Sequence, residues 1–169
     1  MSGEQIHETF FENGIIKTRS RTLDGEIQGL FETFDEEGNI ELKMHYRQGE
    51  LEGDVETFYK KRITAKRSYK ENKLNGLAFI YEKSGAVSAE INYVDGEIHG
   101  SAVYYSSGQI VRKANYKKGE MHGKIQQFSL TQTLIHESTY NNGVLDGVTK
   151  IFSPDGILIE VILYSNGKK

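Results

Sequence analysis

The chain contains no cysteine in its 169 residues. Neither disulfide bonds nor thiolate metal sites can therefore hold it together, and its stability must come from packing. It has no excess of positive charge, because the formal net charge is −3 and the pI is about 6.0, which disfavours nucleic acid as the main partner. It also lacks a run of 18 apolar residues and an N-terminal basic or apolar segment. We therefore expect a soluble, cytoplasmic protein.

Apolar residues are also relatively few. Hydrophobic residues make up 37% of the chain and aromatic residues 11%, which is below the usual apolar share of a compact domain. This composition suits a thin layer with one solvated side and argues against a two-layer core.

Glycine, in contrast, is abundant and regularly placed. Seventeen of the 18 glycines fall in three columns of a unit that recurs every 23 or 24 residues. The clearest stretch reads Tyr-x-x-Gly-x-apolar-x-Gly, and an aromatic residue follows its last glycine by five positions. These last glycines, which we call the motif glycines, are Gly29, Gly53, Gly76, Gly100, Gly123 and Gly147. Such a period is typical of repeat proteins, in which each unit buries its apolar side against its neighbours.

A two-residue turn separates successive units. The turn dipeptides are Asp24-Gly25, Gln48-Gly49, Glu71-Asn72, Asp95-Gly96, Lys118-Gly119, Asn142-Gly143 and Asn166-Gly167. Asn-Gly and Asp-Gly favour type I′ hairpin turns, which need positive φ at both central residues, and Asn72 tolerates that geometry best after glycine. We predict an all-β fold: an elongated, single-layer, twisted antiparallel sheet of about seven hairpins. Residues 1–169 form one array, with a truncated last unit at 164–169.

The turn dipeptides also predict a register. The pairs expected around the second turn are Arg47 with Glu50, Tyr46 with Leu51, Met44 with Gly53, Leu42 with Val55 and Ile40 with Thr57. This register gives an apolar face and, through the alternating residues, a charged face. We expect the tyrosine rings to cover the motif glycines, as in aromatic rescue, and length variation to be confined to the opposite hairpin tips.

The unit, with His99-Gly100 and His122-Gly123 in two copies, resembles the MORN repeat, and its 23 to 24 residue step is similar to the bacterial variant. The resemblance spans nearly the whole chain. It implies a non-enzymatic β ribbon that acts as a scaffold for proteins or lipids. The bacterial variant resembles YwqK-type antitoxins, which implies binding and neutralisation of a cognate toxin. No catalytic residue and no cofactor carries over.

Positions that break the repeat pattern are candidates for specificity. The first break is a column of the apolar face that begins with Leu42, Ala65 and Ala89 and ends in charged or polar groups. Side chains of this column and of the intervening strands can converge on one bound group: Arg112, Gln127, His136, Thr149 and Glu160, with Arg67 on the same face opposite Gly76. The alternative is an open end of the apolar face at which these groups are solvated or paired.

The second break is a basic run without an acid between Tyr59 and Lys70. Its residues include Lys60, Lys61, Arg62 and Lys66. The first three occupy a hairpin tip without its usual glycine, and this basic tip is suited to an acidic partner or to anionic headgroups. An ordinary solvated turn is the alternative.

The two remaining breaks concern histidines and the last strand. His99 and His122 recur at equivalent positions, which suggests metal binding, but the column is otherwise polar and the two are too far apart to share an ion. We therefore expect no metal site there. Ile159, Val161 and Leu163 are apolar where other units carry polar residues, so the final strand has an unprotected edge. Homodimerisation through this edge strand is one way to cover it.

These features favour a non-catalytic protein-binding module, most readily an antitoxin or immunity protein that binds a toxin along the apolar face. The alternative is a scaffold that docks proteins at an anionic membrane surface through the basic tip. An enzyme would need a nucleophile, a metal cluster or an enclosed cleft, and the columns show none of these.

Overall fold

The computed structural model describes residues 3–169, and these form 18 strands and no helix. The strands divide between two compact units, which we call unit 1 (Met1–Gly85) and unit 2 (Ala86–Lys169). No helix long and apolar enough to cross a membrane occurs in the described part of the chain. Because the described residues form strands and no helix, the all-β prediction is confirmed.

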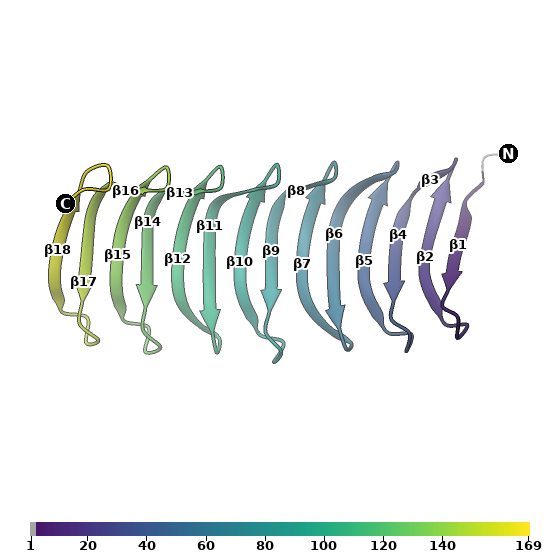
Figure 1. Ribbon diagram of the computed structural model, residues 1–169, viewed down its shortest axis with the longest axis horizontal. Helices are drawn as coiled ribbons and strands as arrows, with labels where there is room; N and C mark the ends of the chain where they lie inside the picture. The colour runs from purple at the N-terminus through teal and green to yellow at the C-terminus, as the bar shows by residue number, and fades with distance from the viewer. Residues whose placement is uncertain (1–2) are drawn as a thin grey trace. The chain divides into compact units, whose positions relative to one another are not determined.

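Each unit contains nine strands. Those of unit 1 are β1 (Gln5–Phe10), β2 (Ile16–Leu23), β3 (Glu26–Ile27), β4 (Gly29–Phe34), β5 (Ile40–Arg47), β6 (Glu50–Tyr59), β7 (Arg62–Lys70), β8 (Lys73–Leu74) and β9 (Gly76–Tyr81). Those of unit 2 are β10 (Val87–Val94), β11 (Glu97–Ser106), β12 (Gln109–Lys117), β13 (Glu120–Met121), β14 (Gly123–Phe128), β15 (Leu134–Asn141), β16 (Val144–Leu145), β17 (Gly147–Phe152) and β18 (Leu158–Tyr164). Within each unit, consecutive strands lie side by side as antiparallel hairpins (Figure 1).

The predicted turns between repeats are confirmed. Both central residues have positive φ in each of the seven dipeptides, including Glu71 at 49° and Asn72 at 64°. The second turn residue also joins its repeat to the previous one: the Gly49 amide donates to the Ile27 carbonyl at 3.0 Å and the Gly143 amide to the Met121 carbonyl at 2.8 Å. Asn72 adds a side-chain contact, because its Oδ1 accepts a hydrogen bond from the Leu51 amide at 2.8 Å.

Length variation falls at the opposite hairpin tips, as predicted. Most tips are closed by a longer turn, for example that in which the Asp35 amide donates to the Asn39 carbonyl at 2.9 Å. The two tips with a two-residue turn are Lys60-Lys61, where φ is 49° and 66°, and Ser107-Gly108, where φ is 51° and 76°. They lie in the repeats from Gly53 to Gly76 and from Gly100 to Gly123, which are the two with a 23-residue step.

The predicted register is right beside the turn and wrong beyond it. Arg47 pairs with Glu50 and Tyr46 with Leu51, but Met44 then pairs with Val55 and Leu42 with Thr57. The predicted pairs of Met44 with Gly53, Leu42 with Val55 and Ile40 with Thr57 are thus displaced by two residues. A bulge at the motif glycine causes the shift. Because the displacement is two residues, each side chain stays on its predicted face.

The motif glycines are required for their backbone conformation. Their φ values lie between 79° at Gly123 and 116° at Gly147, a range that L-residues rarely adopt. A Cβ built at Gly53 would meet the His45 Cβ at 3.6 Å, and one at Gly147 would meet the Thr139 Cβ at 3.1 Å. These neighbours lie on the charged face and none is a tyrosine. A tyrosine pairs directly with the motif glycine on the next strand, as Tyr46 does with Gly29 and Tyr69 with Gly53, and aromatic rescue stays a prediction.

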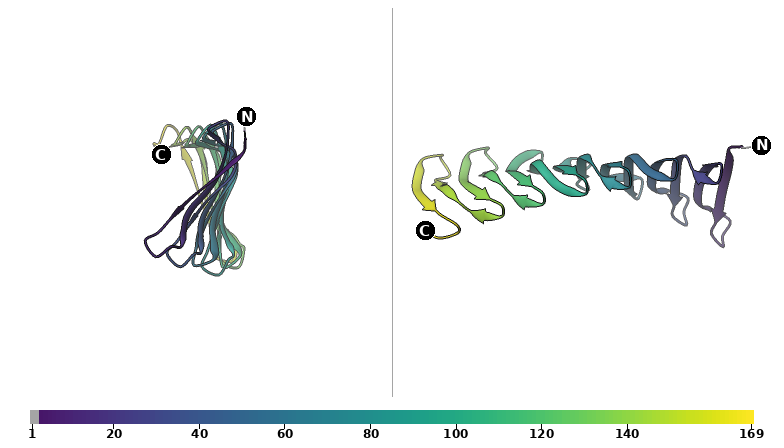
Figure 2. Two further views of the ribbon diagram at one scale, coloured as in Figure 1. Left: turned by 90° about the vertical axis from the view of Figure 1, so that its right-hand side faces the viewer. Right: turned by 90° about the horizontal axis from the view of Figure 1, so that it is seen from above.

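The buried core is small and lies mainly on the apolar face. It consists of Phe34, Val55, Ala65 and Ala78 in unit 1 and of Ala89, Ala102, Ala114 and Ile125 in unit 2. The views in Figure 2 show that the strands of unit 2 form a single layer. Small residues become buried in one layer because longer neighbouring side chains lie over them.

The charged face of unit 1 is a ladder of alternating charges. Its members are successive cross-strand partners: Glu8, Arg19, Glu32, Lys43, Glu56 and Lys66. Arg19 Nε lies 2.9 Å from Glu8 Oε1, and Lys43 Nζ lies 5.8 Å from the centroid of the Phe58 ring. Opposite charges on facing strands stabilise a sheet, so this face satisfies its own charges.

Candidate functional site

A row of polar side chains crosses the apolar face of unit 2. Tyr104 on β11 pairs with Arg112 on β12, Arg112 pairs with Gln127 on β14, and Gln127 pairs with His136 on β15. We call these four residues the polar row. The predicted neighbours Arg112, Gln127 and His136 thus lie on consecutive strands, where cross-strand partners have Cβ atoms about 5 Å apart.

The equivalent row of unit 1 carries no charge. Its successive partners are Thr9, Thr18, Thr33, Leu42, Thr57, Ala65 and Ile80. The first two threonines of this row form a hydrogen bond with each other, with Thr9 Oγ1 at 2.6 Å from Thr18 Oγ1. The sheet therefore does not need an arginine or a histidine at this position, and the polar row is a departure from what the repeat requires.

Arg112 is held without an anionic partner. Its guanidinium carbon lies 5.6 Å from the centroid of the Tyr104 ring, and Nη2 donates to Met121 Sδ at 3.6 Å. Its Nε is buried and makes no hydrogen bond with the described residues. No carboxylate between residues 3 and 169 forms an ion pair with it. A guanidinium offers five donors, so Arg112 retains unused hydrogen-bonding capacity on a partly buried surface.

The neighbouring phenol of Tyr104 is held in its neutral form. Burial, followed by a hydrogen bond with Tyr116, raises the pKa of Tyr104 to about 12. Arg112 opposes this change, but the effects that favour the neutral phenol dominate. The surroundings of Arg112 therefore contain hydroxyl groups and an exposed amide from Gln127, with no negative charge.

His136 lies beside a pair of buried hydroxyls. Ser138 Oγ is 3.4 Å from the His136 ring nitrogens and accepts a hydrogen bond from Thr149 Oγ1 at 3.2 Å. Thr149 pairs with Ile162 and thus lies in the adjacent row, not between His136 and Glu160 as predicted. Ile151 occupies the intervening position, and Glu160 follows it at an exposed site. The two-residue shift at the motif glycine explains this displacement.

Arg67 lies in unit 1, away from the residues of the polar row in sequence. Gly76, its predicted partner, lies on β9, where β7 pairs through Ala65 with Ile80 and through Lys66 with Phe79, so Arg67 is displaced by two residues from Gly76. The built Cβ of Gly76 instead meets the Ser68 Cβ at 3.3 Å. The same register shift accounts for the error, so Arg67 and Gly76 form no common feature.

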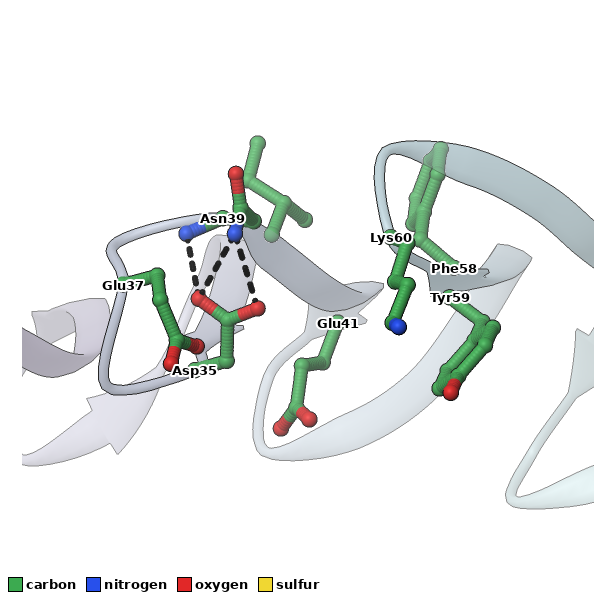
Figure 3. Close-up of a pocket in the computed structure, with 8 residues that line it drawn as sticks. Asp35, Glu37, Asn39, Glu41, Phe58, Tyr59 and Lys60 are labelled. Atoms are coloured by element: carbon green, nitrogen blue, oxygen red, sulfur yellow. Dashed lines mark hydrogen bonds between the residues drawn. The ribbon is translucent and has the colours of Figure 1, made fainter.

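The basic tip of unit 1 borders acidic residues. A pocket of about 370 Å³ lies beside Lys60 and is lined by Asp35, Glu37 and Glu41, with Phe58 and Tyr59 as aromatic walls. Figure 3 shows these carboxylates and the Lys60 ammonium around one space. Lys60 Nζ also lies 5.5 Å from the Tyr59 ring centroid. The tip is therefore part of a mixed-charge surface.

The other predicted cations of this run are engaged within unit 1. Lys66 Nζ lies 2.7 Å from Asp54 Oδ2 and 3.9 Å from Glu56 Oε1, and the hydrogen bond with Asp54 raises the pKa of Lys66. Arg62 Nη1 donates to the Lys83 carbonyl at 2.9 Å. Hydrogen bonds from Asn39 lower the pKa of Asp35, and the charge of Lys61 adds a smaller contribution in the same direction. The run thus provides few uncompensated charges.

The apolar residues of β18 are exposed as predicted. The exposed fractions are 66% for Ile159, 55% for Val161 and 68% for Leu163. Within unit 2, the pairings of β18 run to β17, where Leu163 faces Val148 and Val161 faces Lys150. Homodimerisation through this strand stays a prediction.

Among the described residues, no group of three or more His, Cys, Asp or Glu is arranged to hold a metal ion. His122 nevertheless differs from the surface position expected for it, because its Nδ1 is buried and has no hydrogen-bond partner in the described chain.

Sequence reasoning also missed important residues. Tyr104 and Met121 contact Arg112, and Tyr116 forms a hydrogen bond with Tyr104. Glu137 is buried on the charged face, where it contacts Gln126 at 2.8 Å and Lys124 at 3.2 Å. A signal for Tyr104 existed: it is the one aromatic residue in the column four positions after the motif glycines.

Comparisons with known proteins agree with the repeat architecture. Residues 27–48, 99–118 and 145–166 match the MORN repeat variant family. No curated protein matches the chain. Among solved structures, a mutant of S. aureus TarM in complex with fondaparinux, alpha-GlcNAc-glycerol and UDP is 13% identical, with a TM-score of 0.33, over 77% of this chain and 21% of that chain. This likeness carries no inference, whereas the three matched segments show that these parts of the chain are similar to MORN repeats.

Proposed function

We propose that the protein is a non-catalytic, protein-binding module, and specifically an antitoxin or immunity protein that binds a toxin on the apolar face of unit 2. The observation that carries this proposal is the unpaired guanidinium of Arg112. A charged group on a partly buried face lowers stability unless it is paired. Because the corresponding row of unit 1 is neutral, a protein partner that pairs with Arg112 gives the side chain a role.

The arrangement of unit 2 suits recognition more than chemistry. The polar row provides a guanidinium, an amide, an imidazole and a phenol on adjacent strands of a rigid sheet, with aromatic surface beside them. Aromatic residues and arginine are enriched at the centres of protein interfaces. The antitoxin role is the finer part of the proposal, and it rests on the resemblance of the repeat unit to YwqK-type antitoxins.

A neutralisation assay tests the proposal. The protein encoded beside this gene would be expressed under control of an inducible promoter, with the wild-type chain or with Arg112→Ala. We expect the wild type to restore growth and Arg112→Ala to weaken both rescue and binding, by about tenfold or more in Kd. Arg67→Ala, which alters an arginine of the apolar face in unit 1, is the matched control. Absence of a toxic neighbour, or equal rescue by Arg112→Ala, would contradict this assignment.

Vesicle flotation distinguishes the membrane-scaffold alternative. If the basic tip binds anionic lipid, the protein should float with vesicles containing phosphatidylserine, and Lys60→Glu with Lys61→Glu should abolish flotation. We expect no flotation at physiological salt, because Asp35, Glu37 and Glu41 lie beside the tip and repel an anionic surface. Flotation that depends on these lysines would favour the scaffold.

A further inference from the structure

The guanidinium of Arg112 donates to a weak acceptor within the protein itself. The sulfur of Met121 is the acceptor for Nη2, at 3.6 Å, and Nε beside it has no acceptor in the described chain. A thioether is among the weakest acceptors in proteins, and the methionine side chain is flexible enough to move aside. The edge of the guanidinium formed by Nε and Nη2 is therefore occupied by a group that a better acceptor can displace.

The position of the guanidinium is fixed while this edge is poorly satisfied. A cation–π contact, with the guanidinium carbon 5.6 Å from the centroid of the Tyr104 ring, helps to hold the side chain in place. The backbone at Arg112 is held by pairing on both sides, with Tyr104 on β11 and Gln127 on β14. A pre-positioned planar fork loses little conformational entropy when it binds.

The chemistry around the fork selects an anion. The hydroxyl groups of Tyr104 and Tyr116 and the amide of Gln127 are neutral, and all three can donate hydrogen bonds. The buried cross-strand pair two positions along the same strands, Ala102 and Ala114, presents no carboxylate. A carboxylate has the two oxygens and the spacing that match two parallel N–H donors of arginine.

We infer that Arg112 binds one carboxylate of an acidic side chain of the protein partner, and that this carboxylate takes Nε and Nη2 in place of the Met121 sulfur. This inference deepens the proposed function and rests on it for the identity of the partner as a protein. It assigns Met121 a role as a displaceable occupant of the site, and it makes an aspartate or glutamate the anchor residue of the partner.

Nuclear magnetic resonance of the Arg112 side chain tests the inference without the partner. The blocked peptide acetyl-Gly-Glu-Gly-amide would be titrated into the full chain at constant ionic strength, and the Nε–Hε resonance, assigned by its loss in Arg112→Lys, would be followed. We expect a saturable shift and slower hydrogen exchange at Nε. The glutamine peptide should give no response, and Arg67→Lys should leave the response unchanged.

Substitution of Met121 tests the displacement itself. Met121→Leu keeps the volume and removes the acceptor, so it should lower the half-saturating concentration of the glutamate peptide by about threefold. Met121→Leu with unaltered half-saturation, or a glutamine peptide as effective as the glutamate peptide, would overturn the inference. A phosphoserine peptide that saturates at lower concentration than the glutamate peptide would also overturn it, because the ligand class would then be phosphate.

The outcomes separate this inference from the proposed function. Peptide binding at Arg112 without toxin neutralisation would support the carboxylate site and refute the antitoxin role. Neutralisation with no peptide response at Nε would refute the carboxylate site and leave the antitoxin role standing. Thermal unfolding of each variant must first show that its sheet is intact.

Discussion

Alanine substitutions at the motif glycines should separate backbone conformation from steric crowding. Each unit offers a matched pair. In unit 1, a Cβ at Gly29 meets nothing within 4 Å, whereas one at Gly76 meets the Ser68 Cβ at 3.3 Å. In unit 2, the nearest atom for Gly123 is the Asn115 Cβ at 4.0 Å, whereas Gly147 has the Thr139 Cβ at 3.1 Å.

The structure gives the size of each effect. All four glycines have positive φ, at 82° and 107° in unit 1 and at 79° and 116° in unit 2. Placing an L-residue there costs about 1–2 kcal/mol, and the lower entropy of the unfolded alanine chain returns about 0.5 kcal/mol. Crowding adds about 1–3 kcal/mol where the neighbour is a Cβ fixed to the backbone. Gly29→Ala and Gly123→Ala should therefore cost about 1 kcal/mol, and Gly76→Ala and Gly147→Ala about 3 kcal/mol.

Urea unfolding followed by circular dichroism provides the measurement. The comparison is made within each unit, because repeats near the end of an array unfold more easily than interior ones. Thr139→Ala combined with Gly147→Ala should recover only part of the loss, since the nearest atom at 3.1 Å is the Cβ that alanine retains. Equal losses for the open and crowded members of both pairs would refute the steric part of the reasoning.

Three further predictions follow from the charged groups. The hydrogen bond from Lys66 is the largest cause that lowers the pKa of Asp54 below its ordinary 3.8. Asp54 therefore stabilises the fold above pH 3.8, and this stability is lost as the pH falls through the lowered pKa. Lys66→Met should weaken this acid dependence in urea titrations, and the hydrogen bond from Ser68 should preserve the rest. The pKa of Tyr104 is raised to about 12. The neutral phenol therefore contributes its full share to the free energy of unfolding below about pH 10, and this share is lost as the pH rises toward 12. Tyr104→Phe should remove the last tyrosine to ionise in an ultraviolet absorbance titration. Arg112→Met should raise the free energy of unfolding by about 1 kcal/mol in urea unfolding, because it removes the unsatisfied Nε; a loss of stability would show that Arg112 is satisfied in the folded protein.

The sequence specifies most of this fold through its turns. Asn142-Gly143 and its counterparts adopt positive φ because asparagine, aspartate and glycine tolerate it best. The two-residue shift beside Gly53 was not predictable from alternation, because a displacement of two leaves every side chain on the same face. The alternation of apolar and polar residues indicates which face of the sheet a side chain occupies. It cannot indicate a register change that leaves every side chain on the same face.

The candidate site was predictable only in part for the same reason. Arg112 and His136 break an apolar column, so their unusual chemistry is visible in the sequence. Their neighbours depend on register: Thr149 moves to the adjacent row and Ile151 takes its place beside His136. Lys66 seemed available for a partner until the strand pairing placed it across from Glu56 and its ammonium beside Asp54.

The contrast between the two faces indicates where specificity resides. On the charged face of unit 1, Arg19 is matched by Glu8 at 2.9 Å and Lys66 by Asp54 at 2.7 Å, so the sheet itself uses these charges. On the apolar face of unit 2, Arg112 has only a thioether and an aromatic ring. A partner gains little by competing for charges that are already paired, because it must first break those pairs. An unpaired guanidinium imposes no such cost, and its attraction for a carboxylate is strengthened by the apolar surface around it. The less charged face is therefore the one on which a single charge can select the partner.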